Sequence, residues 1–268
     1  MSTASEPSPD VSGFDVGTAH AARVYDCLLD GKDNFAPDRE VAGKTVAAFP
    51  EAKRLAQQQR DFLRRITAHA AEHGIGQFLE LGSGLPTVKN VHEVAQSIAS
   101  NARIVYIDHD PLVRSHGEAL LATNDLTRVV IADLRQPDAV LGDPRVTALL
   151  DVDQPIAVSL VGVTHFLRGT RGPHEIVAAY RDRLAPGSSI GISAATSTES
   201  DPEMVAGIRA AYENSSSPIV FRSAEEITRF FDGLTIIDPG IVDVCTWRDS
   251  GSVPPDGVRV IGAVGLIT

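Results

Sequence analysis

The residues best suited to chemistry are glycines and carboxylates that follow apolar, strand-like runs. Gly82 and Gly84 come directly after the run "QFLEL", Asp108 ends "RIVYID", and Asp133 follows "RVVIA". If these runs form neighbouring parallel strands, their carboxyl ends meet at one edge of a sheet. Open α/β sheets bind their ligands at that edge, so the spacing predicts a ligand site built from three consecutive strands.

Each of these residue types could hold part of a nucleoside. Glycines at a strand-to-helix turn allow the backbone to approach a ligand closely. Asp108 could hold the two hydroxyls of a ribose, and Asp133 with the backbone N–H of Leu134 could read an adenine edge. Asp133 could instead cap a short turn, and a glycine pair alone is weak evidence. Asp110 precedes a proline and is predicted to cap a helix rather than to bind a ligand.

The residues of this turn indicate which nucleotide-like ligand the site could bind. A dinucleotide-binding turn has the pattern G-x-G-x-x-G, whereas this chain reads "GSGLPT" and lacks the third glycine. Glu80 stands ahead of the glycines, where a pyrophosphate would be repelled. A carboxylate there suits a ligand with a cationic amino group and no phosphates, and S-adenosylmethionine is such a ligand.

Alternating strand and helix patterns must position these residues. Apolar strands that alternate with amphipathic helices predict a parallel α/β sheet covered on both faces. The strands are expected at 77–81, 103–108, 128–134, 155–163 and 188–196, with two more, an antiparallel edge pair, in 234–244 and 258–267. Helices are expected at 18–31, 37–49, 51–74, 87–99, 111–123, 137–142, 173–184, in an insertion at 201–218, and at 223–233.

Composition limits the classes of function. The formal net charge of −11 disfavours nucleic-acid binding, because phosphate neutralisation needs a basic face. No apolar run approaches the roughly 20 residues of a membrane span, so no membrane association is expected. The two cysteines, Cys27 and Cys245, are expected to be free thiols of a reducing compartment, which makes a cytoplasmic location the default. Residues 1–17 are predicted to be a disordered lead, 18–74 a helical cap, and 75–268 the ligand-binding domain.

Several segments resemble a known family. "FLELGSGLPT", "VYIDHDP", "VVIADLRQPDAVL" and "LAPGSSIGIS" resemble the successive cofactor motifs of class I S-adenosylmethionine-dependent methyltransferases. More narrowly, "ARVYDCLLDGKDNFAPDRE" followed by "FLELGSGLPTVKNVHEVAQ" is similar to an actinobacterial S-adenosyl methyltransferase family, a former domain of unknown function. The likeness runs from about residue 18 to "DPGIVDVCTWR". It implies a Rossmann-like three-layer sandwich with a seven-stranded, mostly parallel sheet, an N-terminal helical cap and bound S-adenosylmethionine.

The resemblance also implies cofactor-binding residues. Asp108 would hold the ribose, His109 would lie beside the adenine, and Asp133 and Leu134 would bracket it. The amino-acid half of the cofactor would be lined by Glu80, Leu81, Gly82, Ser83 and Gly84, with Ser159, Leu160 and Val161 beneath the methionine. The chain departs from the family pattern at Asp30 and Cys27, where a glycine and an aromatic residue are expected.

The segment "RVYDCLLDGKDNFAPDR" is unusually polar for two short helices. It is predicted to form a lid over the cofactor, with Tyr25 and Asn34 contributing to the site and an aromatic ring near the sulfonium. The alternative is a purely structural helix pair in which Asp33 or Asn34 caps a helix and Phe35 packs into the core.

Methyl transfer requires alignment more than acid–base chemistry, so a catalytic motif need not be visible. His165, after the fourth strand, is the candidate general base, and a structural histidine beside Phe166 is the alternative. No metal site is predicted. The sequence therefore favours an S-adenosylmethionine-dependent methyltransferase with a small-molecule acceptor, which could form a homodimer. The rivals are a binding protein without turnover, such as a sensor or pseudoenzyme, and a less favoured nucleotide-dependent oxidoreductase.

Overall fold

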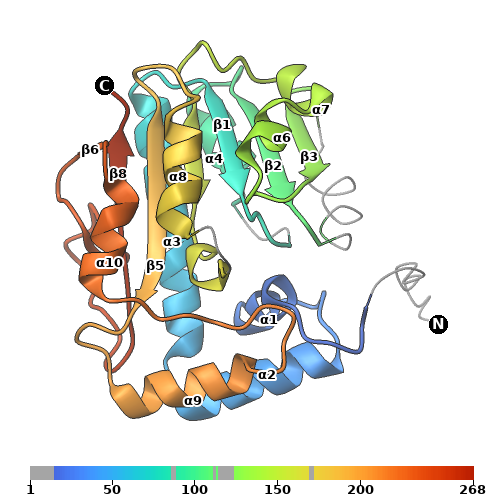
Figure 1. The fold of residues 1–268 in the computed structure, drawn as a ribbon, viewed down its shortest axis with the longest axis vertical. Coiled ribbons are helices and arrows are strands. Elements are labelled where there is room, and N and C mark those ends of the chain that lie inside the picture. Colours follow the sequence, from blue (N-terminus) through green and yellow to red (C-terminus); the bar gives the residue numbers. More distant parts are fainter. Residues whose placement is uncertain (1–14, 86–88, 111–112, 114–123, 169–171) are drawn as a thin grey trace, which may run out of the picture.

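A single mixed sheet forms the centre of the protein (Figure 1). The computed structural model describes residues 15–85, 89–110, 113, 124–168 and 172–268. The strands are β1 (Gln77–Leu81), β2 (Arg103–Asp108), β3 (Thr127–Ile131), β4 (Ala157–Leu160), β5 (Ser189–Thr196), β6 (Thr235–Ile236), β7 (Val242–Asp243) and β8 (Arg259–Leu266). Their order is β3-β2-β1-β4-β5-β8-β6, with β7 also paired to β8.

The predicted fold class is confirmed. Strands β1 to β5 are parallel, and β8 runs antiparallel to β5 over its whole length. The predicted strand count is off by one, because the segment 234–244 forms two short strands, β6 and β7, instead of one. Between them, Pro239 has no N–H to donate and Gly240 has a φ of +88°, so the ladder is interrupted there.

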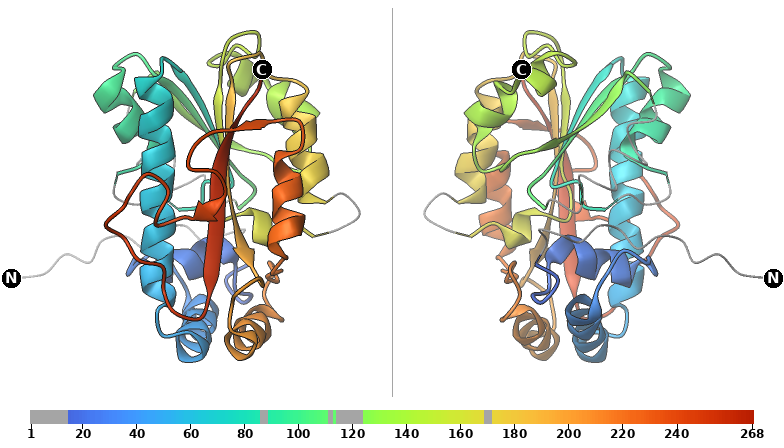
Figure 2. Two further views of the ribbon diagram at one scale, coloured as in Figure 1. Left: turned by 90° about the vertical axis from the view of Figure 1, so that its left-hand side faces the viewer. Right: turned by 90° about the vertical axis from the view of Figure 1, so that its right-hand side faces the viewer.

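Both faces of the sheet are covered by helices, which gives three layers (Figure 2). One face carries α3 (Ala52–Glu72) and α4 (Val91–Ile98), and the other carries α6 (Pro137–Leu141), α7 (Pro144–Thr147), α8 (Pro173–Arg181) and α10 (Ala224–Thr228). Alternate residues of a strand point to opposite faces. In β2, accordingly, Ile104 and Tyr106 belong to one apolar cluster, while Val105 and Ile107 belong to the other.

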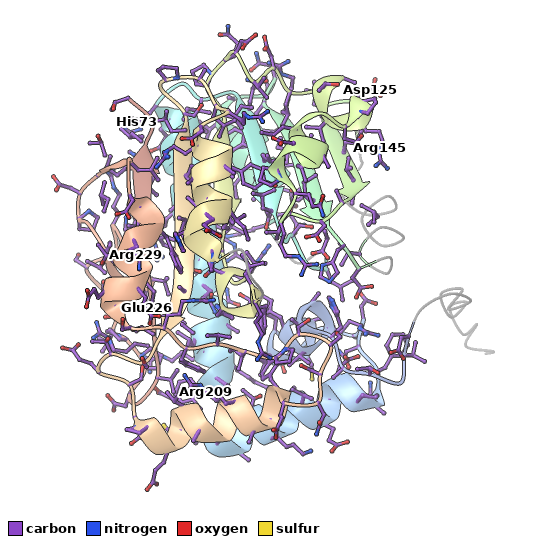
Figure 3. The ribbon with its side chains drawn as sticks, in the orientation of Figure 1. His73, Asp125, Arg145, Arg209, Glu226 and Arg229 are labelled. Carbon is purple, nitrogen blue, oxygen red and sulfur yellow. The ribbon has the colours of Figure 1, made fainter. Side chains whose placement is uncertain are left out.

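A further helical layer lies beyond the carboxyl ends of the parallel strands (Figure 1). It contains α1 (Ala21–Leu28), α2 (Ala36–Ala48) and α9 (Pro202–Tyr212), and α2 and α9 lie side by side in every view. Their close approach requires Gly207, because a Cβ there would lie 2.7 Å from the Cβ of Ala48. Arg209, labelled in Figure 3, ties α9 to the following segment by donating to the carbonyl of Phe221 at 3.2 Å.

Local signals in the sequence account for several helix ends. α10 begins with the expected capping box, in which Ser223 accepts from the N–H of Glu226 and Glu226 accepts from the N–H of Ser223. α3 ends before Gly74, which has a φ of +86°. The helix predicted from residue 87 is described from Val91 onward.

Some predictions from the sequence concern residues that the structure does not describe, and one is not tested by the structure. Residues 1–14 and most of the helix predicted at 111–123 lie outside the described part of the chain. The division of the chain at residue 74 stays a prediction, and α3, within the predicted cap, packs directly against β4, β5 and β8. None of the described helices is long and apolar enough to cross a membrane.

Candidate functional site

A cavity of about 520 Å³ lies at the carboxyl ends of β1 to β4. The sheet supplies its floor, α1 covers it, and α3 closes one side. Its lining residues are His20, Ala21, Ala22, Tyr25, Arg60, Leu63, Glu80, Gly82, Ser83, Gly84, Asp108, His109, Ala132, Asp133, Leu134, Arg135, Val161, Gly162, Val163, Phe166, Leu167, Arg168, Ser216, Ser217 and Pro218. The three strand ends that the sequence singled out therefore share one cavity.

The turn after β1 needs both of its glycines. Gly82 has a φ of +74° and Gly84 a φ of +65°, a region that side chains rarely adopt. A Cβ at Gly82 would also lie 2.5 Å from a methyl carbon of Val163. The N–H groups of Gly82 and Ser83 both donate to the carbonyl of Ile107, at 2.8 and 3.1 Å. The turn is thereby held against the end of β2 with its backbone facing the cavity.

Glu80 is a buried carboxyl group on the cavity wall. Burial raises its pKa to about 7, opposed by the Arg60 guanidinium and assisted by the Asp108 carboxylate. The Arg60 Nη1 lies 4.0 Å from Glu80 Oε1, and both side chains are less than a tenth exposed. A cationic group bound beside Glu80 would favour the ionised form of this carboxyl group, so the position suits a cationic group.

Asp108 joins the glycine turn to the end of β2. Its Oδ2 accepts from the N–H of Gly84 and its Oδ1 from the N–H of Asp110, both at 2.9 Å. Each carboxylate oxygen has a second lone pair, so both can accept further hydrogen bonds from a ligand in the cavity.

A polar cluster ties α1 to the sheet above the end of β2. The His20 Nε2 lies 3.3 Å from the His109 Nε2, and the His20 Nδ1 lies 3.1 Å from Asp110 Oδ2. Arg23 lies between two carboxylates, with its Nε 3.8 Å from Asp110 Oδ2 and 3.7 Å from Asp38 Oδ1. The Asp110 carboxylate therefore anchors the helix that covers the cavity; the helix that it is predicted to cap lies mostly outside the described residues.

Asp133 lies on the cavity wall after β3 and is paired with Arg135. Their side chains form a bidentate ion pair, closest at 2.7 Å, and this hydrogen bonding lowers the pKa of Asp133. Leu134 lines the cavity beside it.

The structure brings ten of the predicted cofactor residues to the cavity and leaves four elsewhere. Those that line it are Tyr25, Glu80, Gly82, Ser83, Gly84, Asp108, His109, Asp133, Leu134 and Val161. Leu81 and Leu160 point to the opposite face of the sheet, where they are fully buried in its apolar cluster. Ser159, one residue earlier in β4, faces α3, deeper in the sheet. Asn34 holds the loop after α1 by donating to Asp26 Oδ2 at 2.9 Å.

His165 lies in the 3₁₀ turn η1 (Thr164–Phe166) and does not line the main cavity. Its ring packs beside Phe166, with centroids 4.5 Å apart, and faces a separate apolar cavity of about 80 Å³. Burial, with Arg222 nearby, lowers its pKa to about 3. This neutral, buried ring matches the structural alternative, so we do not propose it as a general base.

Sequence reasoning missed several lining residues. Arg60 lies on the buried face of α3, four residues after Ala56 and three before Leu63, both buried. A charged residue on an apolar helix face was the signal that could have identified it. His20, Arg168 and the segment 216–218 carry no comparable signal, because only the tertiary fold brings them to the cavity. Within the described residues, no group of three or more His, Cys, Asp or Glu could hold a metal ion.

Comparisons with known proteins agree with this geometry. A family model described as S-adenosyl methyltransferase matches residues 8–267. The crystal structure of a candidate methyltransferase from Thermobifida fusca is 40% identical, with a TM-score of 0.89, covering 98% of this chain and 100% of that chain. A DUF574 family protein from Streptomyces avermitilis is 32% identical, with a TM-score of 0.89, covering 95% of this chain and 99% of that chain. No curated protein matches the chain.

Proposed function

Because the chain belongs to the S-adenosyl methyltransferase family, we propose that its main cavity binds S-adenosylmethionine and that the protein transfers a methyl group to a small-molecule acceptor. The observation that carries this proposal is the convergence of Glu80, the Gly82–Gly84 turn, Asp108 and Asp133 on one cavity at the sheet edge. The family and the fold support S-adenosylmethionine as the cofactor. The lining of the cavity supports the choice of residues proposed to bind it.

The residues present fit this cofactor. The cavity offers carboxylates for a ribose and an adenine at the ends of β2 and β3, and a buried carboxyl group for an ammonium at the end of β1. The turn after β1 reads "GSGLPT" and lacks the third glycine of a dinucleotide-binding turn, which agrees with a ligand without phosphates. When bound, S-adenosylmethionine supplies an activated methyl group on a sulfonium sulfur.

The chain's own contribution is to bind and align the reacting groups. In the proposed site Asp108 accepts hydrogen bonds from ribose hydroxyls while it continues to hold the N–H of Gly84. Tyr25 donates from its hydroxyl to the carbonyl of Ala56 at 2.8 Å, which fixes its ring on the cavity wall. A fixed wall of this kind favours an in-line arrangement of donor and acceptor, the kind of positioning that accelerates a reaction between two bound groups.

A small acceptor is supported by the two adjoining cavities of the site. The main cavity and the apolar cavity beside it share Ala21, Tyr25 and Phe166, and residues of α1 and α3 line both. Space of this kind admits a small apolar group more readily than a macromolecule. The net charge of −11 also disfavours a nucleic acid as acceptor.

The proposal is tested by calorimetric titration with S-adenosylmethionine, S-adenosylhomocysteine and NAD. We expect the two sulfur ligands to bind and NAD not to bind. Asp108→Ala should weaken binding of both sulfur ligands by about tenfold or more, because a hydrogen-bonded charged group is lost. The control is Asp138→Ala, which removes an exposed carboxylate on α6 outside the cavity lining and should leave the affinity unchanged.

Two outcomes would overturn the assignment. If neither sulfur ligand bound, the assignment of S-adenosylmethionine as the cofactor would be wrong. A preference for NAD would favour an oxidoreductase. Formation of S-adenosylhomocysteine in the presence of candidate acceptors would then separate an enzyme from a binding protein without turnover.

A further inference from the structure

Arg60, on α3, is a buried cation with few hydrogen bonds of its own. Its side chain lines the main cavity and the residue is 7% exposed. Within the described part of the chain, its Nη2 donates to Asn90 Oδ1 at a long 3.4 Å, and its Nε is buried without a hydrogen-bond partner. A guanidinium carries five N–H donors, and buried donors without partners are costly. The position therefore calls for an acceptor that the described residues do not provide.

Glu80 does not meet this need. The closest approach of the two side chains, from Arg60 Nη1 to Glu80 Oε1, is 4.0 Å, which is beyond hydrogen-bond distance. Both groups face the same cavity, so it presents a cation and a carboxyl group side by side. An α-amino acid carries an ammonium and a carboxylate on a single carbon atom. The pair is complementary in charge to such a zwitterion.

We propose that Arg60 binds the α-carboxylate of the amino-acid half of the cofactor, while Glu80 accepts hydrogen bonds from its ammonium group. This inference rests on the proposed function, since it assigns a binding residue within the same site. A guanidinium can bind a carboxylate with two parallel hydrogen bonds, which fixes its orientation as well as its distance. Arg60 thereby makes the site selective for ligands with an intact amino-acid group.

The surrounding structure holds Arg60 in place for this role. Its neighbours on α3, Phe62 and Leu63, are buried against the rest of the core. Asn90, which caps α4, has its own N–H bound to Glu93 Oε2 at 2.6 Å, so the acceptor of Arg60 Nη2 is itself fixed. Two helices on one face of the sheet thus position a side chain that no strand-end motif would include.

The test uses ligands that differ by one group. S-adenosylhomocysteine has both the ammonium and the carboxylate, and 5′-S-(3-aminopropyl)-5′-thioadenosine keeps the ammonium but lacks the carboxylate. We expect the wild-type protein to bind S-adenosylhomocysteine about ten- to hundredfold more tightly than the aminopropyl compound in calorimetric titrations, as for a charged hydrogen-bonded contact. Equal affinities for the two compounds would overturn the proposal, whatever the variants do.

The variants assign the effect to the residue. Arg60→Gln should weaken S-adenosylhomocysteine binding about ten- to hundredfold and leave the affinity for the aminopropyl compound unchanged. Arg60→Lys should lose part of the affinity, because a lysine cannot form the bidentate contact; it also serves if Arg60→Gln does not fold. The control is Arg64→Gln, one helical turn along α3 and outside the cavity lining, which should bind both ligands like the wild type.

The possible failures are distinguishable. If the wild-type protein binds no S-adenosylhomocysteine, the proposed function itself is wrong. If it binds this ligand but the Arg60 variants lose affinity equally for both compounds, Arg60 only supports the fold of the site. If the variants lose affinity for neither compound, the carboxylate is bound elsewhere.

Discussion

At the scale of single residues, the site combines groups whose charges are costly without a ligand. Glu80 is buried on the cavity wall, and its burial outweighs the attraction of Arg60, so that its pKa rises to about 7. The carboxyl group is therefore about half protonated at neutral pH. A ligand ammonium would favour the ionised form, so cofactor binding and proton release at Glu80 should be coupled.

This coupling predicts a pH-dependent affinity. Glu80 is mostly protonated at pH 6 and mostly ionised at pH 8, and the apparent affinity scales with the fraction of competent protein. S-adenosylhomocysteine should therefore bind about tenfold more tightly at pH 8 than at pH 6, with protons released on binding below pH 7. Calorimetric titrations in buffers of different ionisation enthalpy measure both effects.

Two controls isolate Glu80. The dependence of the S-adenosylhomocysteine affinity on pH should disappear in Glu80→Gln, because glutamine cannot ionise. It should also be absent for 5′-S-(3-carboxypropyl)-5′-thioadenosine, which lacks the amino group. If the affinity of Glu80→Gln still depended on pH, the pH dependence would belong to another group of the cavity.

At the scale of elements, α1 and α3 end with the same hydrogen-bonding pattern but different residues. In α3, the N–H of Ile75 donates to the carbonyl of Ala70 and Gly74 has a φ of +86°. In α1, the N–H of Gly31 donates to the carbonyl of Asp26, and the left-handed position is occupied by Asp30, with a φ of +60°. This geometry is the Schellman motif, in which glycine is favoured. This geometry favours a glycine at the position of Asp30, which is the residue that the resemblance leads us to expect there.

Asp30→Gly should therefore stabilise the protein. Relief of the left-handed conformation is expected to raise the free energy of unfolding by about 0.5 to 1 kcal/mol. The variant loses an ion pair with Lys53, but both side chains are more than half exposed, so the loss should be small. Denaturant unfolding measures the change. Asp30→Asn removes the ion pair alone and should be close to neutral, while a destabilised Asp30→Gly would show that the ion pair dominates.

At the scale of the whole molecule, the cavity depends on layers that are far apart in sequence. α1 covers the sheet edge, and α2 holds α1 through Asp38, whose Oδ1 accepts from the N–H of His20 at 2.9 Å. α9, from the segment inserted after β5, lies along α2. The C-terminal segment is fixed to α3 by Arg65, which donates to the carbonyl of Trp247 at 2.8 Å. Separating α2 from α9 should therefore disturb the cavity from a distance.

Gly207→Leu tests this dependence. A side chain at position 207 would collide with Ala48, so the variant should lose about 1 to 3 kcal/mol of unfolding free energy through overpacking. It should also bind S-adenosylhomocysteine more weakly, although Gly207 does not line the cavity. Denaturant unfolding and calorimetry measure the two effects. Gly43→Leu is the matched control, because a Cβ at this glycine of α2 meets nothing within 4 Å. If Gly207→Leu kept full affinity, the helical layer would not position the site.

The sequence by itself determined the fold class and the strand-end part of the site. Alternating apolar runs and amphipathic helices specify a parallel sheet, and a parallel sheet brings the residues after β1, β2 and β3 to one edge. Gly82, Gly84, Asp108 and Asp133 could therefore be found without coordinates, since their role depends on local backbone geometry and strand order.

The tertiary structure alone decided which residues outside the strand ends face the cavity. The 3₁₀ turn after β4 directed His165 into a separate apolar cavity, whereas the orientation of Leu81 and Leu160 away from the main cavity follows from strand alternation, which the sequence already specifies. Packing of α3 on the sheet brought Arg60 beside Glu80 from a helix that precedes the first strand. Side-chain direction and contact between distant segments depend on how helices pack. Local patterns in the sequence do not record that packing, because it is fixed by the surfaces of all layers together.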